Sequence, residues 1–266
     1  MIYCNLKGAL GNMMFQIATA TSFAIERNTS ASFPNLHSHL NYLNKENCHI
    51  PSLKHAHEYL KIFSDLRFDS PNINLLTVKY PFHYEDKSLP LSCWVDGFFQ
   101  SEKYFSKHRE KILNLFSIPD EIFPQIKKYE KYNKLKTVSL HVRRGDYLKF
   151  SKTYRILSLD YYKTALEIIG DIDKVLIFSD DIPWCIEKFG QDKRSVFIDE
   201  KDYISLFLMA KCDHNIIANS SFSWWGAWLN TSQKKKVICP SQWVGAGLSH
   251  LNTCDIHCVD WIKIKG

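Results

Sequence analysis

The sequence predicts an α/β protein with parallel β-sheets, divided into two domains. Between residues 137 and 240, short apolar runs alternate with segments of helical periodicity, and Lys174–Ser179 (KVLIFS) is almost continuously apolar. Such runs are typical of parallel strands covered on both faces. Near the amino terminus, the strand-like Ile2–Leu6 leads through a glycine-containing turn into a helical segment. Ligands of such sheets bind at the carboxyl ends of the strands.

The second half carries the clearer pattern of alternating elements. We expect a helix after Ser158, which can cap it, because apolar residues from Tyr162 to Ile169 follow the i, i+3, i+4, i+7 spacing. Another helix is expected to start near Pro183, and a third after the capping residue Asp202. The expected strands are Thr137–Val142, Lys174–Ser179, Ser195–Ile198, Asn215–Ala218 and Val237–Cys239, and Ser221–Leu229 is expected to be helical.

The first half has fewer regular elements. After the strand Ile2–Leu6, we expect a helix from about Asn12, then a strand at Trp94–Phe98 and a helix capped by Ser101. Residues 30–90 show no pattern that assigns an element. Because residues 119–136 are charged and weakly patterned, we place the boundary there, giving domains 1–133 and 134–266.

Composition narrows the classes of function. The chain has 266 residues, 45% of them hydrophobic, and a net charge of +6, which suits a phosphate-bearing ligand or an anionic membrane surface. Without a long basic stripe, nucleic acid is not an expected partner. We expect no transmembrane segment and a cytoplasmic protein with reduced cysteines, optionally peripheral at the inner face of the membrane. Cys254, His257 and Cys258 lie close together, but no second ligand pair accompanies them, so no metal site is predicted.

The strongest chemical motif is His141-Val-Arg-Arg-Gly-Asp-Tyr147, at the end of a predicted strand. An arginine fork holds a diphosphate through two charge-assisted hydrogen bonds, and it stabilises the charge that grows on the diphosphate when a sugar leaves. We favour Arg143 as the ligand contact and expect Arg144 to brace the site. The alternative is a surface ion pair of either arginine with Asp146.

Three further segments follow predicted strands. Gly8–Asn12 joins a strand to a helix. Its glycines either let the backbone approach a ligand or form a tight turn without a ligand. Asn219–Gly226 opens a helix, and its serines either bind an anion or cap the helix, with the tryptophans in the core. Asp180 and Asp181 either read the N–H edge of guanine or cap the next helix. Asp96, Glu102 and Asp146 are candidates for a general base.

These motifs together resemble bacterial α-1,2-fucosyltransferases of glycosyltransferase family 11. The resemblance rests on five segments that occur in the family's order: GALGNMMFQIA from Gly8, GFFQSEKYF from Gly97, HVRRGDY from His141, FSDD from Phe178 and HNIIANSSFSWWGAWLN from His214. Where the family usually has glutamine, the chain has Met13, a departure that bears on acceptor preference.

The resemblance implies a GT-B-type fold with two Rossmann-like domains whose parallel sheets face a cleft. It implies inverting transfer of L-fucose from GDP-fucose to O2 of a terminal galactose, in an oligosaccharide or a lipid-linked glycan, with no required metal or other cofactor. The resemblance implies Arg143 as the group that grips the diphosphate. We favour Asp146 as the carboxylate that orients or deprotonates the acceptor hydroxyl, with direct attack with little base assistance as the alternative. The expected GDP-fucose contacts are Gly11, Asn12, His141, Arg143, Arg144, Asp180, Asp181, Asn219, Ser220, Ser221 and Phe222. Another GDP-sugar or linkage, or a non-catalytic binding module of the same fold, remains an alternative.

Overall fold

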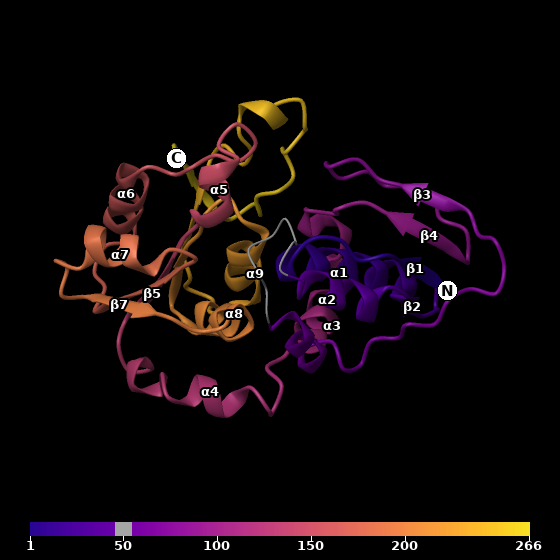
Figure 1. The fold of residues 1–266 in the computed structure, drawn as a ribbon, viewed down its shortest axis with the longest axis horizontal. Coiled ribbons are helices and arrows are strands. Elements are labelled where there is room, and N and C mark those ends of the chain that lie inside the picture. The colour runs from indigo at the N-terminus through magenta and orange to yellow at the C-terminus, as the bar shows by residue number, and fades with distance from the viewer. Residues whose placement is uncertain (46–54) are drawn as a thin grey trace. The chain divides into compact units, whose positions relative to one another are not determined.

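A computed structural model describes residues 1–45 and 55–266 (Figure 1). The chain forms two compact units, the first comprising Met1–Pro119 with Leu251–Cys258 and the second Asp120–His250 with Val259–Gly266. The division therefore falls after Pro119 and not after residue 133, and residues 251–258 return to the first unit. Segment 120–136 packs on the second unit: Ile126 is buried, and the Tyr129 hydroxyl donates to Glu200 Oε1 at 2.7 Å.

The first unit has a four-stranded parallel sheet in the order β2-β1-β4-β3. Its helix α1 begins at Leu10, two residues before the expected start, because Gly8 adopts a φ of 75° that turns the chain sharply out of β1. The strands are β1 (Ile2–Cys4), β2 (Ala31–Ser32), β3 (Thr77–Lys79) and β4 (Cys93–Asp96), and the helices are α1 (Leu10–Glu26), α2 (Leu36–Leu43) and α3 (Arg109–Leu115), with short 3₁₀ helices at Ala56–Lys61, Glu102–Tyr104 and Ser106–His108.

The second unit has a six-stranded parallel sheet in the order β10-β9-β8-β5-β6-β7. Its strands are β5 (Thr137–Val142), β6 (Lys174–Ser179), β7 (Ser195–Ile198), β8 (His214–Ile216), β9 (Val237–Pro240) and β10 (Ile262–Ile264). Its helices are α4 (Phe123–Lys127), α5 (Gly145–Lys149), α6 (Leu159–Ile169), α7 (Ile182–Phe189), α8 (Asp202–Lys211) and α9 (Ser221–Leu229), with 3₁₀ turns at Glu130–Tyr132 and Ala246–Leu248.

Both faces of the central part of this sheet are buried. On one face, Tyr161 and Ala165 of α6 and Cys185 of α7 pack against apolar residues of β5 and β6. On the other face, buried Asn215 donates to Ser139 Oγ at 2.7 Å and to the Met209 carbonyl of α8 at 2.8 Å. The continuous apolar strands therefore have the parallel, doubly covered arrangement that their sequences predict.

Only some of the helices begin at the capping residues that the sequence predicts. The Ser158 hydroxyl accepts from Tyr161 N–H at 3.2 Å and caps α6, as expected. Ser101 caps only a 3₁₀ turn, because Tyr104 and Phe105 are buried and the regular helix α3 starts later, at Arg109. Asp202 lies inside the first turn of α8, where Lys201 takes the capping position, so its predicted capping role is wrong.

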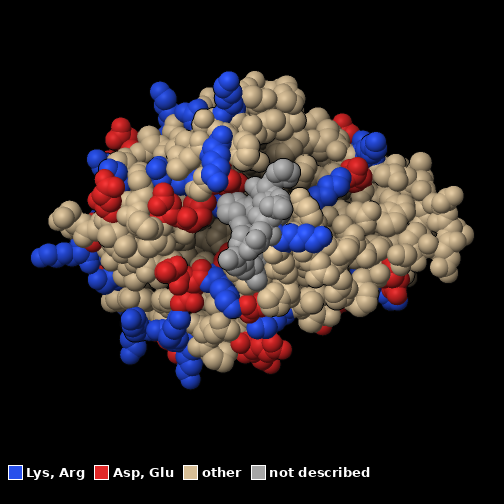
Figure 2. Space-filling view, in the orientation of Figure 1, with Lys and Arg blue, Asp and Glu red and all other residues tan. Residues whose placement is uncertain are grey.

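Charge is dispersed over the face of the molecule that Figure 2 presents, where basic and acidic side chains are interspersed. Across the described residues, no helix has both the length and the apolar character needed to cross a membrane.

Candidate functional site in the second unit

The candidate site lies at the carboxyl ends of β5 and β6. These strands pair in parallel with Val142 opposite Ser179, so the residues that follow them leave the sheet side by side. Arg143 and Arg144 on one strand thereby meet Asp180 and Asp181 on the other. This is the edge of a parallel sheet at which ligands bind.

Arg143 is held between two carboxylates. One guanidinium nitrogen donates to Asp146 Oδ1 at 2.7 Å, and the other lies 3.1 Å from Asp180 Oδ2. Burial lowers the pKa of Arg143, but the negative charges of Asp180 and Asp146 outweigh it and raise the pKa, so the guanidinium is always charged. Because 23% of its side chain remains exposed, this fixed cation is accessible to an anionic ligand.

Arg144 points to different partners. Its Nε donates to Asp181 Oδ2 at 3.0 Å, and its guanidinium lies over the Trp184 ring at 4.1 Å. Its backbone N–H donates to Asp180 Oδ1 at 2.8 Å. Arg144 therefore braces the start of α7, and its side chain, at 18% exposed, is only slightly less accessible than that of Arg143.

Asp180 and Asp181 both form contacts that stabilise this arrangement. Asp181 caps α7 by accepting from Trp184 N–H at 3.2 Å, which was one of its two expected roles. Asp180 accepts from the backbone N–H of Arg144 with one carboxylate oxygen and pairs with the Arg143 guanidinium through the other. Gly145 makes this contact sterically feasible, because a β-carbon there would lie 2.5 Å from Asp180 Oδ2.

Tyr147 is a site residue that the sequence alone did not single out. Its ring lies 5.3 Å from the Arg143 guanidinium, and its hydroxyl donates to the Asn219 carbonyl at 2.9 Å. It therefore connects the arginine to the loop that precedes α9. The available signal was its place at the end of the motif His141–Tyr147, which also contains Arg143.

The segment before α9 combines fixed and available groups. Buried Asn219 uses its side-chain amide to hold the carbonyls of Arg155 and Trp243, at 3.0 and 2.9 Å, so it shapes the loop. Ser220 occupies the N-cap of α9 but forms no side-chain capping bond. The helix start thus offers backbone N–H groups and a hydroxyl to an anion. The core role expected for Trp224, Trp225 and Trp228 is confirmed by their burial.

His141 lies beside this loop, with its ring 5.4 Å from that of Phe222. Burial, and then the charge of Arg143, lower the pKa of His141 to about 3. Its Nδ1 is buried without a hydrogen-bond partner among the described residues. A neutral imidazole of such low basicity contacts a ligand as a dipole and not as a proton acceptor.

The buried His141 predicts a pH dependence of stability. Because its folded pKa of about 3 lies below the unfolded value of 6.5, the unfolded state binds the extra proton first as pH falls. Stability is therefore intact above pH 6.5 and decreases below it, by about 1.4 kcal/mol per pH unit for one group. Denaturant unfolding of the wild type and of His141→Gln should show the wild type losing more stability between about pH 6 and 4. Parallel curves would contradict this burial.

Gly11 and Asn12 belong to the first unit, in the first turn of α1. Asn12 Oδ1 accepts from Gln100 Nε2 at 2.7 Å, which ties the turn to the segment after β4. Within residues 1–45 and 55–266, no group of three or more His, Cys, Asp or Glu side chains is arranged to hold a metal ion.

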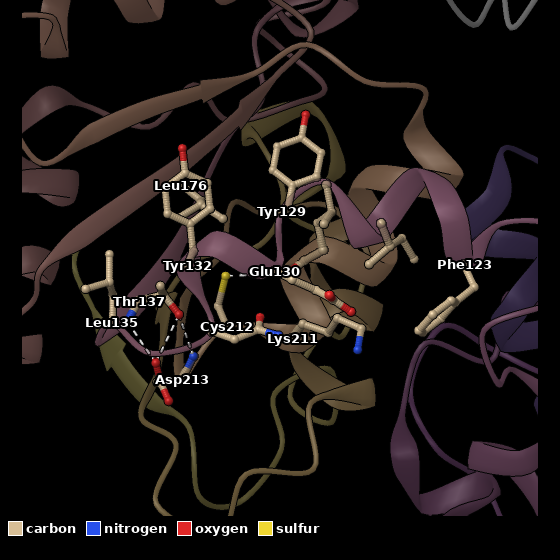
Figure 3. A pocket seen from close by; sticks show the side chains of 13 residues that line it. Phe123, Tyr129, Glu130, Tyr132, Leu135, Thr137, Leu176, Lys211, Cys212 and Asp213 are labelled. Atoms are coloured by element: carbon tan, nitrogen blue, oxygen red, sulfur yellow. Dashed lines mark hydrogen bonds between the residues drawn. The ribbon is translucent and has the colours of Figure 1, made fainter.

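A cavity of about 270 Å³ in the second unit lies elsewhere (Figure 3). Its wall includes Thr137, the first residue of β5, together with Tyr129, Tyr132 and Cys212. It is therefore at the amino ends of the strands, opposite the edge that carries Arg143. None of the predicted site residues lines it, and the arginine site is the better candidate for chemistry.

Comparison with known proteins identifies the family of the chain. The model of the family "Glycosyl transferase family 11" matches residues 1–265. An alpha-1,2-colitosyltransferase of Escherichia coli is 30% identical, with 99% of each chain covered. The O-antigen biosynthesis glycosyltransferase WbnK of Escherichia coli is 36% identical over 63% of this chain, which spans 59% of that protein's length. A galactoside alpha-(1,2)-fucosyltransferase 1 of Alouatta belzebul is 24% identical over 54% of this chain and 44% of its own.

Solved structures show the fold. The α-1,6-fucosyltransferase NodZ co-crystallised with GDP superimposes with a TM-score of 0.51 at 13% identity, over 85% of this chain and 91% of that one. A second NodZ structure, from Bradyrhizobium, gives 0.52 at 13% identity, over 85% and 90%. The predicted α/β fold of the GT-B type, with parallel sheets, is thereby confirmed. The match along almost the whole chain identifies the protein as a glycosyltransferase that belongs to glycosyl transferase family 11.

Proposed function

We propose that the protein transfers L-fucose from GDP-fucose to O2 of a terminal galactose in an oligosaccharide or lipid-linked glycan, with inversion at the anomeric carbon. Membership of the family supports sugar transfer. The relatives named for α-1,2 transfer support the linkage.

The observation that carries the proposal is Arg143, a partly exposed guanidinium fixed by Asp146 and Asp180 at the carboxyl edge of the sheet. In the proposed reaction, the acceptor oxygen bonds to C1 of the sugar while the bond from C1 to the β-phosphate oxygen breaks. GDP leaves with the bonding electrons. A cation that is already in place stabilises this new charge without having to reorganise.

The neighbouring groups complete the donor site in this proposal. Ser220, Ser221 and the N–H groups at the start of α9 bind the diphosphate, and His141 and Phe222 contact the nucleotide. Asn219 shapes their loop through Arg155 and Trp243. Gly11 and Asn12 are further donor contacts in this proposal, as the resemblance to the family implies. No metal ion takes part in the proposed reaction.

The acidic residues are assigned by their contacts. Asp146 and Asp180 orient Arg143, and Asp181 and Arg144 fix the start of α7. In this proposal, Asp180 and Asp181 accept hydrogen bonds from guanine only through those lone pairs of their carboxylate oxygens that are not used in these contacts. Asp146 receives the proton of the acceptor hydroxyl, or this proton passes to water in a direct attack, because GDP is a good leaving group.

A second donor has specific support. A relative that matches 99% of the chain is a colitosyltransferase. Colitose is L-fucose without its 3-hydroxyl, so a site that hydrogen-bonds this hydroxyl favours GDP-fucose strongly, whereas an apolar site does not.

The test compares donors. The purified protein is incubated with a galactose-terminated oligosaccharide and either GDP-fucose, GDP-colitose or GDP-mannose, and the product linkage is determined by NMR. We expect GDP-fucose to give an α-1,2-linked product with the highest kcat/KM. A preference for GDP-colitose would replace the donor assignment, and binding of GDP without any transfer would support a binding module.

A further inference from the structure

The sheet of the first unit has one partly open face near its carboxyl edge. Along β4, Cys93 and Val95 are buried, whereas Trp94 and Asp96 on the opposite face are partly exposed. A parallel sheet is usually covered on both faces. An aromatic side chain is therefore left partly open to solvent near this edge of the sheet.

A cavity of about 270 Å³ lies over this face, lined by Asn5, Lys7, Thr77, Trp94, Val95 and Asp96. Strand register sets Tyr3 of β1 and Thr77 of β3 on the two sides of Trp94 of β4. The Tyr3 ring packs against the indole at 5.3 Å and fixes it in place. The cavity thus has an aromatic wall, supported from behind by a second ring.

The rim of the cavity is polar. Lys7 forms an ion pair with Asp96, and both side chains are well exposed, at 47% and 37%. Asn5 is exposed beside them and also lines the cavity. A carboxylate accepts hydrogen bonds from two hydroxyls, and an ammonium and an amide donate to others.

These groups match the two sides of a pyranose ring. A hexose has one face of C–H groups, which packs on an aromatic ring, and an edge of hydroxyls, which suits Asp96, Lys7 and Asn5. The volume lies just below that of typical ligand pockets, which begin at about 300 Å³, so it suits a single sugar residue. The carboxylate of Asp96 disfavours a phosphate.

We propose that the cavity between Trp94 and Asp96 binds one hexopyranose residue of the acceptor glycan. This assignment rests on the proposed function, because it names the part of the protein that recognises the acceptor. The aromatic platform sets the affinity for the acceptor, while the donor site is in the second unit.

The test measures acceptor and donor separately. At saturating GDP-fucose, Trp94→Ala should raise the KM for a galactose-terminated acceptor at least about tenfold, whereas GDP affinity measured by calorimetry stays unchanged. Trp94→Phe, which retains an aromatic face, should recover most of the affinity. Asp96→Asn, a surface change, should also raise the KM for the acceptor. This variant carries the test if Trp94→Ala folds poorly. Phe68→Ala, which removes an exposed aromatic of the first unit outside the cavity, is the control and should leave KM as it is.

A direct titration separates this inference from the proposed function. Methyl β-D-galactopyranoside, added to the full-length protein, should shift the indole NMR signal of Trp94 saturably, and Asp96→Asn should weaken this binding. If the protein transfers no sugar yet the titration succeeds, the proposed reaction fails and the sugar site remains. An unchanged acceptor KM in both variants, or a titration without effect on Trp94, would overturn the assignment.

Discussion

Replacing Arg143 with alanine is expected to lower kcat by about 10³-fold, the effect of removing a preorganised group that stabilises the charge of a transition state. The structure gives the reason: Arg143 is a charged fork held by Asp146 and Asp180 at the ligand-binding edge of the sheet. Transfer of labelled fucose under saturating substrates measures the effect. Arg143→Lys should remain well below the wild type, because an ammonium keeps the charge but loses the two parallel hydrogen bonds.

Arg194→Ala is the matched control for this experiment. Arg194 also pairs with a carboxylate, donating to Asp192 at 2.7 Å, but it precedes β7 and so lies at the amino edge of the same sheet. Its removal should leave kcat within about twofold of the wild type, because a surface ion pair contributes about 1 kcal/mol or less to stability. An Arg143→Ala protein that folds and retains normal turnover would refute the role of Arg143.

Gly145→Ala is expected to lower kcat by about 100-fold, although it adds only one methyl group. The added carbon would lie 2.5 Å from Asp180 Oδ2, so the carboxylate must move. Arg143 then loses one of its two anchors and no longer holds its position for the diphosphate. Steady-state kinetics should show the loss mainly in kcat, with a smaller change in GDP affinity.

Gly170→Ala separates this effect from loss of stability. Gly170 ends α6 with a φ of 90°, and a β-carbon there would meet no atom within 4 Å. Alanine in this conformation is strained by at least about 1 kcal/mol, so the variant should melt at a lower temperature with an unchanged kcat. If Gly145→Ala keeps full activity, the exact position of the Asp180 carboxylate does not matter for turnover.

Much of the second unit follows from local sequence signals. Continuous apolar runs predicted β5, β6 and β7 with their observed bounds, and Ser158 predicted the start of α6. The strands that escaped prediction, β2, β3 and β10, are only two or three residues long. Their pairing is decided by neighbouring strands and not by their own pattern, because β3 and β10 are largely exposed.

The site was only partly predictable for a similar reason. The sequence marked Arg143 as a ligand contact and offered Asp146 as an ion-pair partner three residues later, but the second anchor required the register of β5 and β6, which brings Asp180 beside Arg143 from 37 positions later in the chain. The role of Gly145 depends on that same contact, so no local pattern reveals it. Tyr147 likewise acts through Asn219, which lies in a loop far along the chain.

A crystal structure of the protein with GDP tests the central claim most directly. The fixed guanidinium of Arg143 should lie within about 3 Å of a β-phosphate oxygen, with Asp146 and Asp180 still holding its other side. Nucleotide bound elsewhere, with its phosphates beyond the reach of Arg143, would contradict the account.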